Sequence, residues 1–251
     1  MNALILTMGK GQRARPWSHF CNKVLFKVDR IPLIVHHIKE LASRGVRNIV
    51  IMAGKSCRQI ETLAKEETRA KVTVWRMSSL APGSGGYCRT VMNRFRFKRS
   101  IIIYGDTFFE GSSYDLAIES YRSSKNYILV EPPIDDKGVV IYNKNTGAVI
   151  SIDESGRSRE TPVNGLRGRN TGLMALNRDM LWKKKGDLMR DLLPARVKYL
   201  HAKPVKERGF DLGEIDNYIR FIVSRNLPDT EVFRTEQIFC ISKEILEGLN
   251  G

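Results

Sequence analysis

The sequence has few of the residues that build disulfide frameworks or zinc sites. Four cysteines occur in 251 residues, and none forms a Cys-x-x-Cys pair or lies near a histidine at metal-ligand spacing. The adjacent His36 and His37 would point about 100° apart on a helix, so we expect them to be structural and partly buried. We expect reduced thiols in a reducing compartment for the cysteines, which are Cys21, Cys57, Cys88 and Cys240.

Long apolar segments are also missing. No run approaches the ~18 uncharged residues that a membrane helix needs. The first residues, MNALILTMGKG, have no charged region followed by a long apolar one, as a signal peptide would. We therefore expect a soluble, cytoplasmic protein without a membrane partner.

Acidic residues are the minority among the charged ones. The chain has 27 Asp and Glu against 42 Lys and Arg, a formal net charge of +15. Such a balance suits anionic partners such as nucleic acid or phosphorylated small molecules. The basic residues are scattered, with the densest cluster at 94–99, which favours a solvated basic surface or a phosphate-rich substrate site. No nucleic-acid recognition motif is present, so we do not expect nucleic acid as a partner.

Apolar runs and amphipathic segments alternate along the first half of the chain. Short continuous apolar runs are typical of strands buried on both faces. Repeated β-loop-α units predict an α/β fold with a doubly wound, mostly parallel central sheet. The expected strands are 3–6, 48–53, 71–77 and 101–104, and the expected helices are 32–44, 56–69 and a segment after the glycine-rich turn 82–86.

The second half predicts a small mixed β extension. A turn-rich NKNTG between 138–142 and 148–152 indicates a hairpin. No Pro/Ser-rich linker or internal repeat divides the chain, so we expect one domain over 1–233 and an amphipathic helix within 234–251. That helix would pack on the core or pair between subunits of a homo-oligomer. The other expected elements are strands 127–130, 172–176 and 198–205, and helices 114–122, from 177 to about 193, 214–224 and 235–249.

A Gly/Arg/Lys-rich segment follows the first predicted strand. Gly9 and Gly11 allow backbone N–H groups to approach a polyphosphate, Arg13 can bind phosphate bidentately, and Lys23 supplies a mobile charge. The position matches where open α/β sheets bind ligands. A Walker A loop is absent, and Ala14 stands where a dinucleotide fingerprint needs its third glycine.

This segment resembles the signature of the sugar-1-phosphate nucleotidylyltransferases, L-A-A-G-x-G-T-R-L-x-P followed by P-K-P-L. The resemblance continues in order to about Tyr218. It implies a Rossmann-like nucleotidyltransferase fold, and the absence of hexapeptide repeats implies no β-helix tail. The further blocks are Gly83-Ser84-Gly85-Gly86 for G-T-A-G, Tyr104-Gly105-Asp106-Thr107 for N-G-D-T, Asn170-Thr171-Gly172-Leu173 for N-A-G-I, and Phe210-Asp211-Leu212-Gly213 for D-I/V-G-T.

The resemblance implies Mg²⁺-dependent transfer of a nucleotidyl group from a nucleoside triphosphate to a sugar 1-phosphate, with release of pyrophosphate. It carries roles onto matching positions of this sequence. Arg13, Lys23 and Asp106 would be catalytic, and Asp106 with Asp211 would hold Mg²⁺. The nucleotide-binding positions would be Leu6, Gly9, Gly11, Arg13, Gly83 and Gly86, and the sugar-phosphate positions Gly138, Glu154, Asn170 and Gly172.

Several positions depart from the family pattern. Glu154 is followed by Ser155-Gly156 where the family has Lys-Pro, so one expected phosphate contact is missing. Arg157, Arg159 and Arg169 are candidates to replace it. The identities of base and sugar stay open, because four further departures surround the motifs: Thr7-Met8 for Ala-Ala, Gln12 for Thr, Asn22 for Pro and Glu214 for Thr.

Two alternatives share much of this pattern. A cytidylyltransferase for phosphocholine or a similar phospho-alcohol would have the same N-terminal signature. A non-catalytic homologue would bind a nucleotide-sugar and regulate a partner, although Arg13, Lys23, Asp106 and Asp211 are all retained.

Overall fold

A computed structural model describes residues 1–8, 22–54, 56–67, 69–77, 82–133, 138–155, 160–212, 217–218 and 221. Several predicted features lie outside these residues. They are Gly9, Gly11, Arg13, Cys21, Cys240, Arg157, Arg159, most of the helix predicted over 214–224, and the terminal helix with its boundary at 233.

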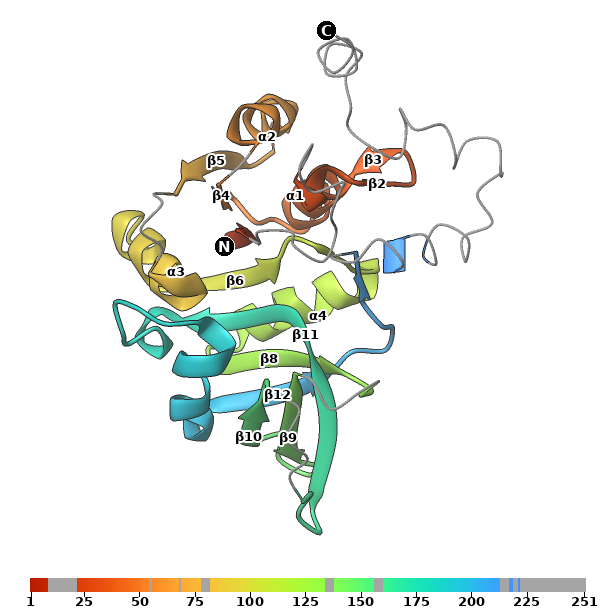
Figure 1. The fold of residues 1–251 in the computed structure, drawn as a ribbon, viewed down its shortest axis with the longest axis vertical. Coiled ribbons are helices and arrows are strands. Elements are labelled where there is room, and N and C mark those ends of the chain that lie inside the picture. Colours follow the sequence, from red (N-terminus) through yellow and green to blue (C-terminus); the bar gives the residue numbers. More distant parts are fainter. Residues whose placement is uncertain are drawn as a thin grey trace, which may run out of the picture.

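Four parallel strands form the centre of the sheet, namely β1 (Asn2–Thr7), β4 (Asn48–Ala53), β5 (Lys71–Arg76) and β6 (Arg99–Tyr104). Their order is β6-β1-β4-β5, and Figure 1 shows the N-terminus, where β1 begins, between β6 and β4. Ala3 in β1 pairs with Ile49 on one side and Ile101 on the other. The buried apolar runs of the sequence therefore lie in the middle of the sheet, with their carboxyl ends at one edge.

Helices cover both faces of these strands, which confirms the doubly wound expectation. Alternate side chains of a strand point to opposite faces. Ala3 and Ile5 of β1 therefore pack in one hydrophobic core, and Leu4 and Leu6 in the other. The first core includes residues of α1 (Leu33–Ser43), α2 (Cys57–Ala64) and α4 (Gly111–Arg122), and the second includes α3 (Gly83–Arg94).

A long antiparallel strand, β11 (Gly165–Asn177), joins the parallel centre to the mixed extension (Figure 1). Its second half pairs with β6 and β8 (Asn126–Glu131), and its first half pairs with β9 (Val139–Asn143). The predicted hairpin is confirmed, because β9 pairs antiparallel with β10 (Val149–Asp153). β12 (Leu200–Pro204) pairs parallel with β8.

Two short strand pairs complete the described sheets. β2 (Lys27–Val28) pairs with β3 (Ile31–Pro32), and β7 (Thr107–Phe108) pairs with β13 (Phe210–Asp211). The second pair brings the chain around 210 back to the end of β6. Among the described residues, no helix is long and apolar enough to span a membrane.

The helix predicted from 177 to about 193 is wrong. Short turns replace it: a 3-10 helix at Arg178–Met180, a π-helix at Leu188–Leu192 and a 3-10 helix at Pro194–Tyr199. The physical reason lies at 186–187. Gly186 has a φ of 132°, which no right-handed helix uses, and Asp187 is extended. Its carboxylate caps a new helix by accepting from the backbone N–H groups of Met189 and Arg190.

Two predicted helix starts also differ from the structure. Ser56 precedes α2, but its φ of 62° is left-handed and its side chain makes no capping hydrogen bond. α2 ends at Ala64, earlier than predicted, because the chain turns there and the N–H of Arg69 donates to the carboxylate of Glu67. The glycines predicted as a turn at 82–86 lie largely within the first turn of α3.

We expect the sheet centre to dominate stability. Ile103 of β6 is fully buried, so Ile103→Ala should lower the free energy of unfolding by about 2–5 kcal/mol. Ile150 of β10 is 42% exposed, and Ile150→Ala should change it by less than about 0.5 kcal/mol. Urea unfolding followed by circular dichroism measures both. Equal losses for the two variants would contradict this packing.

Candidate active site

A cavity of about 480 Å³ opens at the carboxyl ends of β1 and β6, beside the start of α3. This is where open α/β sheets bind ligands. Met8 and Asn22, which flank the predicted phosphate-binding segment, both line it. The full lining is Leu6, Thr7, Met8, Asn22, Lys23, Val24, Met77, Gly83, Ser84, Tyr87, Tyr104, Asp106 and Asp187.

Lys23 and Asp106 face each other in this cavity. The Lys23 Nζ lies 3.9 Å from Asp106 Oδ2, and the two side chains are 9% and 34% exposed. Burial of an ammonium group is costly unless a negative group lies nearby. The arrangement therefore places a held positive charge beside a more accessible carboxylate, at the wall of a cavity large enough for a nucleotide.

Asn22 holds the turn that carries Lys23. Its Nδ2 donates to the carbonyl oxygen of Thr7, and its Oδ1 accepts from the N–H of Val24. The side chain thus ties the end of β1 to the 3-10 turn at Lys23–Leu25. The asparagine that replaces the family's proline performs a positioning role that proline, without a side-chain donor, could not.

The chain around Asp211 lies directly beside Asp106. Asp211 pairs with Thr107 in the β7–β13 ladder, and the N–H of Leu212 donates to the carbonyl oxygen of Asp106 over 2.9 Å. In the described part of the chain, no group of three or more His, Cys, Asp or Glu could hold a metal. Two carboxylates suit Mg²⁺ nonetheless, because it commonly takes one or two from the protein and completes its shell with phosphates and water.

The glycines at the start of α3 pack against the segment 184–188. The N–H groups of Gly85 and Gly86 donate to the carbonyl oxygen of Gly186. A Cβ at Gly83 would lie 2.5 Å from that same oxygen, so only glycine fits there. Gly83 lines the cavity, whereas a Cβ at Gly86 would meet the backbone of Lys184. Close approach to protein backbone thus explains both glycines.

Asp187 is a site residue outside the sequence motifs, and Ser84 lies within the Gly83-Ser84-Gly85-Gly86 block, where only the glycines have a predicted role. The hydroxyl of Ser84 donates to Asp187 Oδ2 over 2.8 Å and accepts from the N–H of Leu188. Both side chains line the cavity. The two residues are 103 positions apart, and no local pattern marks Asp187, so only the fold brings them together.

The predicted sugar-phosphate positions come together at the first half of β11. The N–H of Asn170 donates to the carbonyl oxygen of Gly138, and the Asn170 side chain accepts from the N–H of Gly172. Glu154 Oε1 lies 3.7 Å from where a Cβ of Gly138 would be. Gly172 has a φ of 84° and lies against Tyr104, which lines the main cavity. The predicted sugar-phosphate positions therefore adjoin the main cavity.

Glu154 also lines a second cavity of about 630 Å³, next to Asp153 and Arg190. Burial raises the pKa of the Glu154 carboxyl, and Asp187 raises it further. Arg190 and Arg169 oppose this shift. The Glu154 carboxyl therefore interacts electrostatically with Asp187, which lines the main cavity, and with two nearby guanidinium groups.

Thr7 and Met8, which stand where the family pattern has two alanines, pack in different places at the end of β1. Thr7 is buried, and its hydroxyl donates to the carbonyl oxygen of Met52. Met8 lines the cavity and packs against the second core. Leu6, a predicted nucleotide-binding position, lines the same wall.

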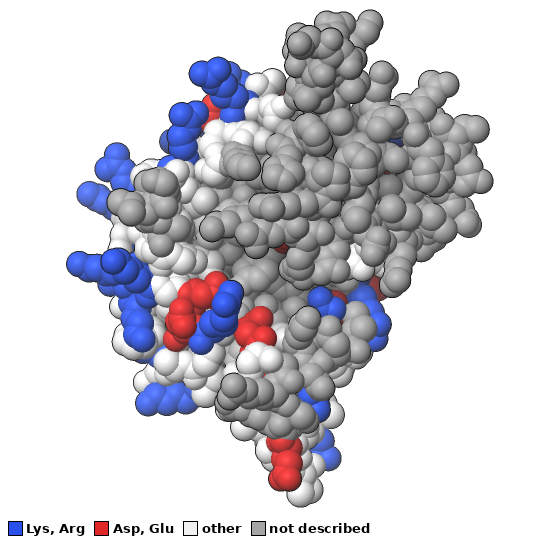
Figure 2. All heavy atoms as spheres, viewed as in Figure 1, with Lys and Arg blue, Asp and Glu red and all other residues white. Residues whose placement is uncertain are grey.

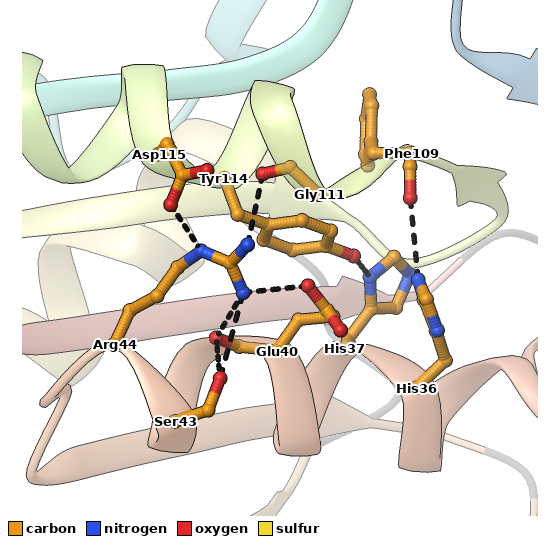
Figure 3. Close-up of polar contacts among 9 residues, drawn as sticks. All are labelled: His36, His37, Glu40, Ser43, Arg44, Phe109, Gly111, Tyr114 and Asp115. Carbon is orange, nitrogen blue, oxygen red and sulfur yellow. Dashed lines mark hydrogen bonds and ion pairs between the residues drawn. The ribbon is translucent and has the colours of Figure 1, made fainter.

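Polar contacts join α1 to α4 around His37 (Figure 3). His37 is fully buried, and its Nε2 lies 3.2 Å from the carbonyl oxygen of Gly105, the residue before Asp106. A carbonyl only accepts, so Nε2 carries the proton and Nδ1 accepts from the hydroxyl of Tyr114 over 2.6 Å. Arg44 joins α1 to α4 through Asp115. The histidine pair is structural, as expected, although His37 is buried more completely.

On the face that Figure 2 shows, the described basic side chains lie in several places rather than in one. Figure 2 shows Lys and Arg along several parts of the visible face, with Asp and Glu among them. This distribution agrees with the scattered positions in the sequence.

Residues 2–221 match the nucleotidyl transferase family, and the chain belongs to that family. The resemblance seen in the sequence motifs is therefore confirmed. The mannose-1-phosphate guanyltransferase of Schizosaccharomyces pombe is 26% identical over 232 residues, covering 87% of this chain and 62% of the yeast protein. A bifunctional sugar-1-phosphate nucleotidylyltransferase/acetyltransferase of Sulfurisphaera tokodaii is 25% identical, covering 92% of this chain and 59% of its own. The chain spans about three fifths of the length of these relatives.

Solved structures share the fold. HddC from Yersinia pseudotuberculosis, complexed with GMP-PN, superposes with a TM-score of 0.71 at 22% identity, covering 90% of this chain and 99% of that one. A UDP-glucose pyrophosphorylase complexed with UDP-glucose gives a TM-score of 0.71 at 16% identity, covering 89% and 97%. The predicted α/β nucleotidyltransferase architecture is thereby confirmed.

The His37 network makes stability depend on pH. Burial, with a smaller contribution from His36, lowers the pKa of His37 from 6.5 to about 3. Below pH 6.5 the unfolded chain therefore binds a proton that the folded chain excludes, and stability falls as the pH falls toward 3. His37→Gln keeps an N–H donor for Gly105 but does not titrate. Between pH 7 and pH 5, wild type should lose about 2 kcal/mol more unfolding free energy than the variant. Urea titrations at both pH values test this, and equal losses would contradict a buried neutral His37.

Proposed function

We propose that this protein transfers a nucleotidyl group from a nucleoside triphosphate to a sugar 1-phosphate in the cytoplasm. A phosphate oxygen of the sugar 1-phosphate attacks the α-phosphorus, and a new P–O bond forms. The bond between the α-phosphorus and the α–β bridging oxygen breaks, and pyrophosphate leaves. The observation that carries the proposal is the Lys23–Asp106 pair in the cavity at the ends of β1 and β6, with the Asp211 strand beside it.

This reaction needs positioning and charge stabilisation rather than a covalent intermediate. Lys23 would stabilise the negative charge that gathers on the phosphates in the transition state, and its burial keeps it in place before substrate binds. Arg13 would hold the β- and γ-phosphates and the leaving pyrophosphate. Backbone groups at Gly9 and Gly11 would contact the phosphates, and Leu6 and Gly83 would border the nucleotide.

Asp106 and Asp211 fit a site for Mg²⁺, because both are carboxylates and their backbones are hydrogen-bonded neighbours. When bound there, Mg²⁺ would neutralise part of the phosphate charge. In this proposal Asp106 has two roles. It pairs with Lys23 and so keeps that ammonium group in the cavity, and it is one of the two carboxylates of the metal site.

Gly138, Glu154, Asn170 and Gly172 would receive the sugar 1-phosphate. Their contacts with one another and the contact of Gly172 with Tyr104 support this placement. Carboxylate and amide groups suit sugar hydroxyls, which both donate and accept hydrogen bonds. The relatives favour GTP with mannose 1-phosphate as the first pair to assay.

A substrate panel tests the reaction class. Pyrophosphate release with Mg²⁺ would be measured for ATP, GTP, CTP, UTP and dTTP, each combined with several sugar 1-phosphates and with phosphocholine. One active sugar 1-phosphate pair, lost in Asp106→Asn, is the expected result. Activity with CTP and phosphocholine alone would contradict the proposed acceptor. Nucleotide-sugar binding with no turnover for any pair would indicate a regulatory homologue instead.

Lys23 should matter for turnover rather than for folding. Lys23→Ala should lower kcat about 100-fold or more at saturating substrates, the scale for loss of one transition-state charge contact. Lys144→Ala is the matched control, because Lys144 is exposed in the β9–β10 turn. Steady-state kinetics at constant Mg²⁺ measure both. Unchanged kcat in Lys23→Ala would exclude a catalytic role for this lysine.

A further inference from the structure

Arg169 is a partly buried arginine with unused donors at the sugar end of the site. Its side chain is 27% exposed, and its Nε lies 3.8 Å from Glu131 Oε1. Among the described residues, Glu131 is the only acidic side chain that an Arg169 nitrogen reaches at ion-pair distance, and the terminal nitrogens donate no hydrogen bond. A guanidinium has five N–H donors, and its two terminal nitrogens match the oxygens of a phosphate.

Glu131 is the buried partner of Arg169 in this ion pair. Its side chain is 4% exposed, and Oε2 accepts from the N–H of Gly209 over 2.9 Å. Gly209 directly precedes β13, the strand that carries Asp211. The carboxylate therefore fixes the Nε edge of Arg169 and the backbone leading to Asp211 at the same time. A guanidinium that approaches a carboxylate through Nε still has N–H donors at its terminal nitrogens.

The surroundings of Arg169 are the proposed sugar-phosphate positions. Arg169 directly precedes Asn170 on β11, and its Cγ lies 3.9 Å from where a Cβ of Gly138 would be. Glu154 Oε1 approaches the same point within 3.7 Å, and Arg169 lowers the pKa of Glu154 against the effect of burial. Gly138 leaves open the space where these side chains converge.

We propose that Arg169 binds the phosphate group of the sugar 1-phosphate, in place of the lysine that is missing after Glu154. This proposal rests on the proposed function, because it assigns the acceptor's phosphate to one residue of the same site. Arg190 is the rival within the described residues, since it also interacts with Glu154. Arg190 is exposed at the second cavity, and within the described part of the chain it forms no ion pair with a buried carboxylate, so Arg169 is the better-positioned cation.

The test compares binding of a sugar with and without its phosphate. Isothermal titration would measure the Kd of the sugar 1-phosphate that turns over in the panel, of the same free sugar, and of the nucleoside triphosphate. Arg169→Gln should weaken binding of the sugar 1-phosphate about 10- to 100-fold, the range for a lost charge-assisted phosphate contact. Binding of the free sugar and of the triphosphate should change less than about twofold, because neither uses this cation.

Matched variants separate this role from folding. Arg178→Gln, just after the other end of β11, should leave all three Kd values unchanged. Arg169→Lys keeps the charge without the planar fork and should show an intermediate loss. Methylguanidinium should restore part of the sugar 1-phosphate affinity of Arg169→Ala, which a merely structural arginine would not allow. An unchanged Kd for Arg169→Gln, or a loss seen in Arg190→Gln instead, overturns the proposal.

The result is distinguishable from failure of the proposed function. If wild type turns over no sugar 1-phosphate in the panel, the reaction assignment fails before Arg169 is tested. If wild type is active and Arg169→Gln retains its preference for the sugar 1-phosphate over the free sugar, only the Arg169 assignment fails.

Discussion

The site depends on keeping the positive charge of Lys23 at a nearly buried position. The whole residue Lys23 is 7% exposed. Removal of its ammonium group from water is costly unless negative groups compensate for it. Asp106 supplies one such group at 3.9 Å. Asn22 then restrains the turn that carries the lysine, and His37 restrains the backbone before Asp106. Because these restraints exist without substrate, the protein would need little reorganisation when phosphate charge develops in the proposed reaction, which is how electrostatic preorganisation accelerates a reaction.

Local patterns in the sequence were sufficient for the elements that build the sheet. The run 48–53 is a strand with the predicted bounds, since short buried apolar runs leave few alternatives. The block at Asp106 was also recognisable, because its residues are consecutive at a strand end. By contrast, Gly186 ends helical geometry through a φ of 132° that depends on its contact with Pro82 and the first turn of α3. A single-sequence pattern holds no information about such a contact.

The same reason explains which site residues the motifs missed. Asp187, the partner of Ser84, and Glu131, the partner of Arg169, lie outside the motifs and far along the chain from the residues that they contact. Motif matching transfers roles to positions that resemble a family pattern, so it marks the loss of a lysine after Glu154 but leaves Arg157, Arg159 and Arg169 as alternative replacements. Buried carboxylates without a motif, such as Glu131, become interpretable only when their partners are known.

β11 connects the part of the site at Asp106 with the part that contains Arg169 and Asn170. Its second half is bonded to β6, whose end carries Asp106, and its first half carries Arg169 and Asn170. The register shifts between Asn170 and Met174, where Gly172 lies against Tyr104 of the nucleotide cavity. A β-bulge redirects side chains at such a point without breaking the strand. In the proposed reaction, the bulge would place the predicted sugar-phosphate residues beside the main cavity, and the regular pairing on β6 would keep the two parts at a fixed distance, as in-line attack on the α-phosphorus requires.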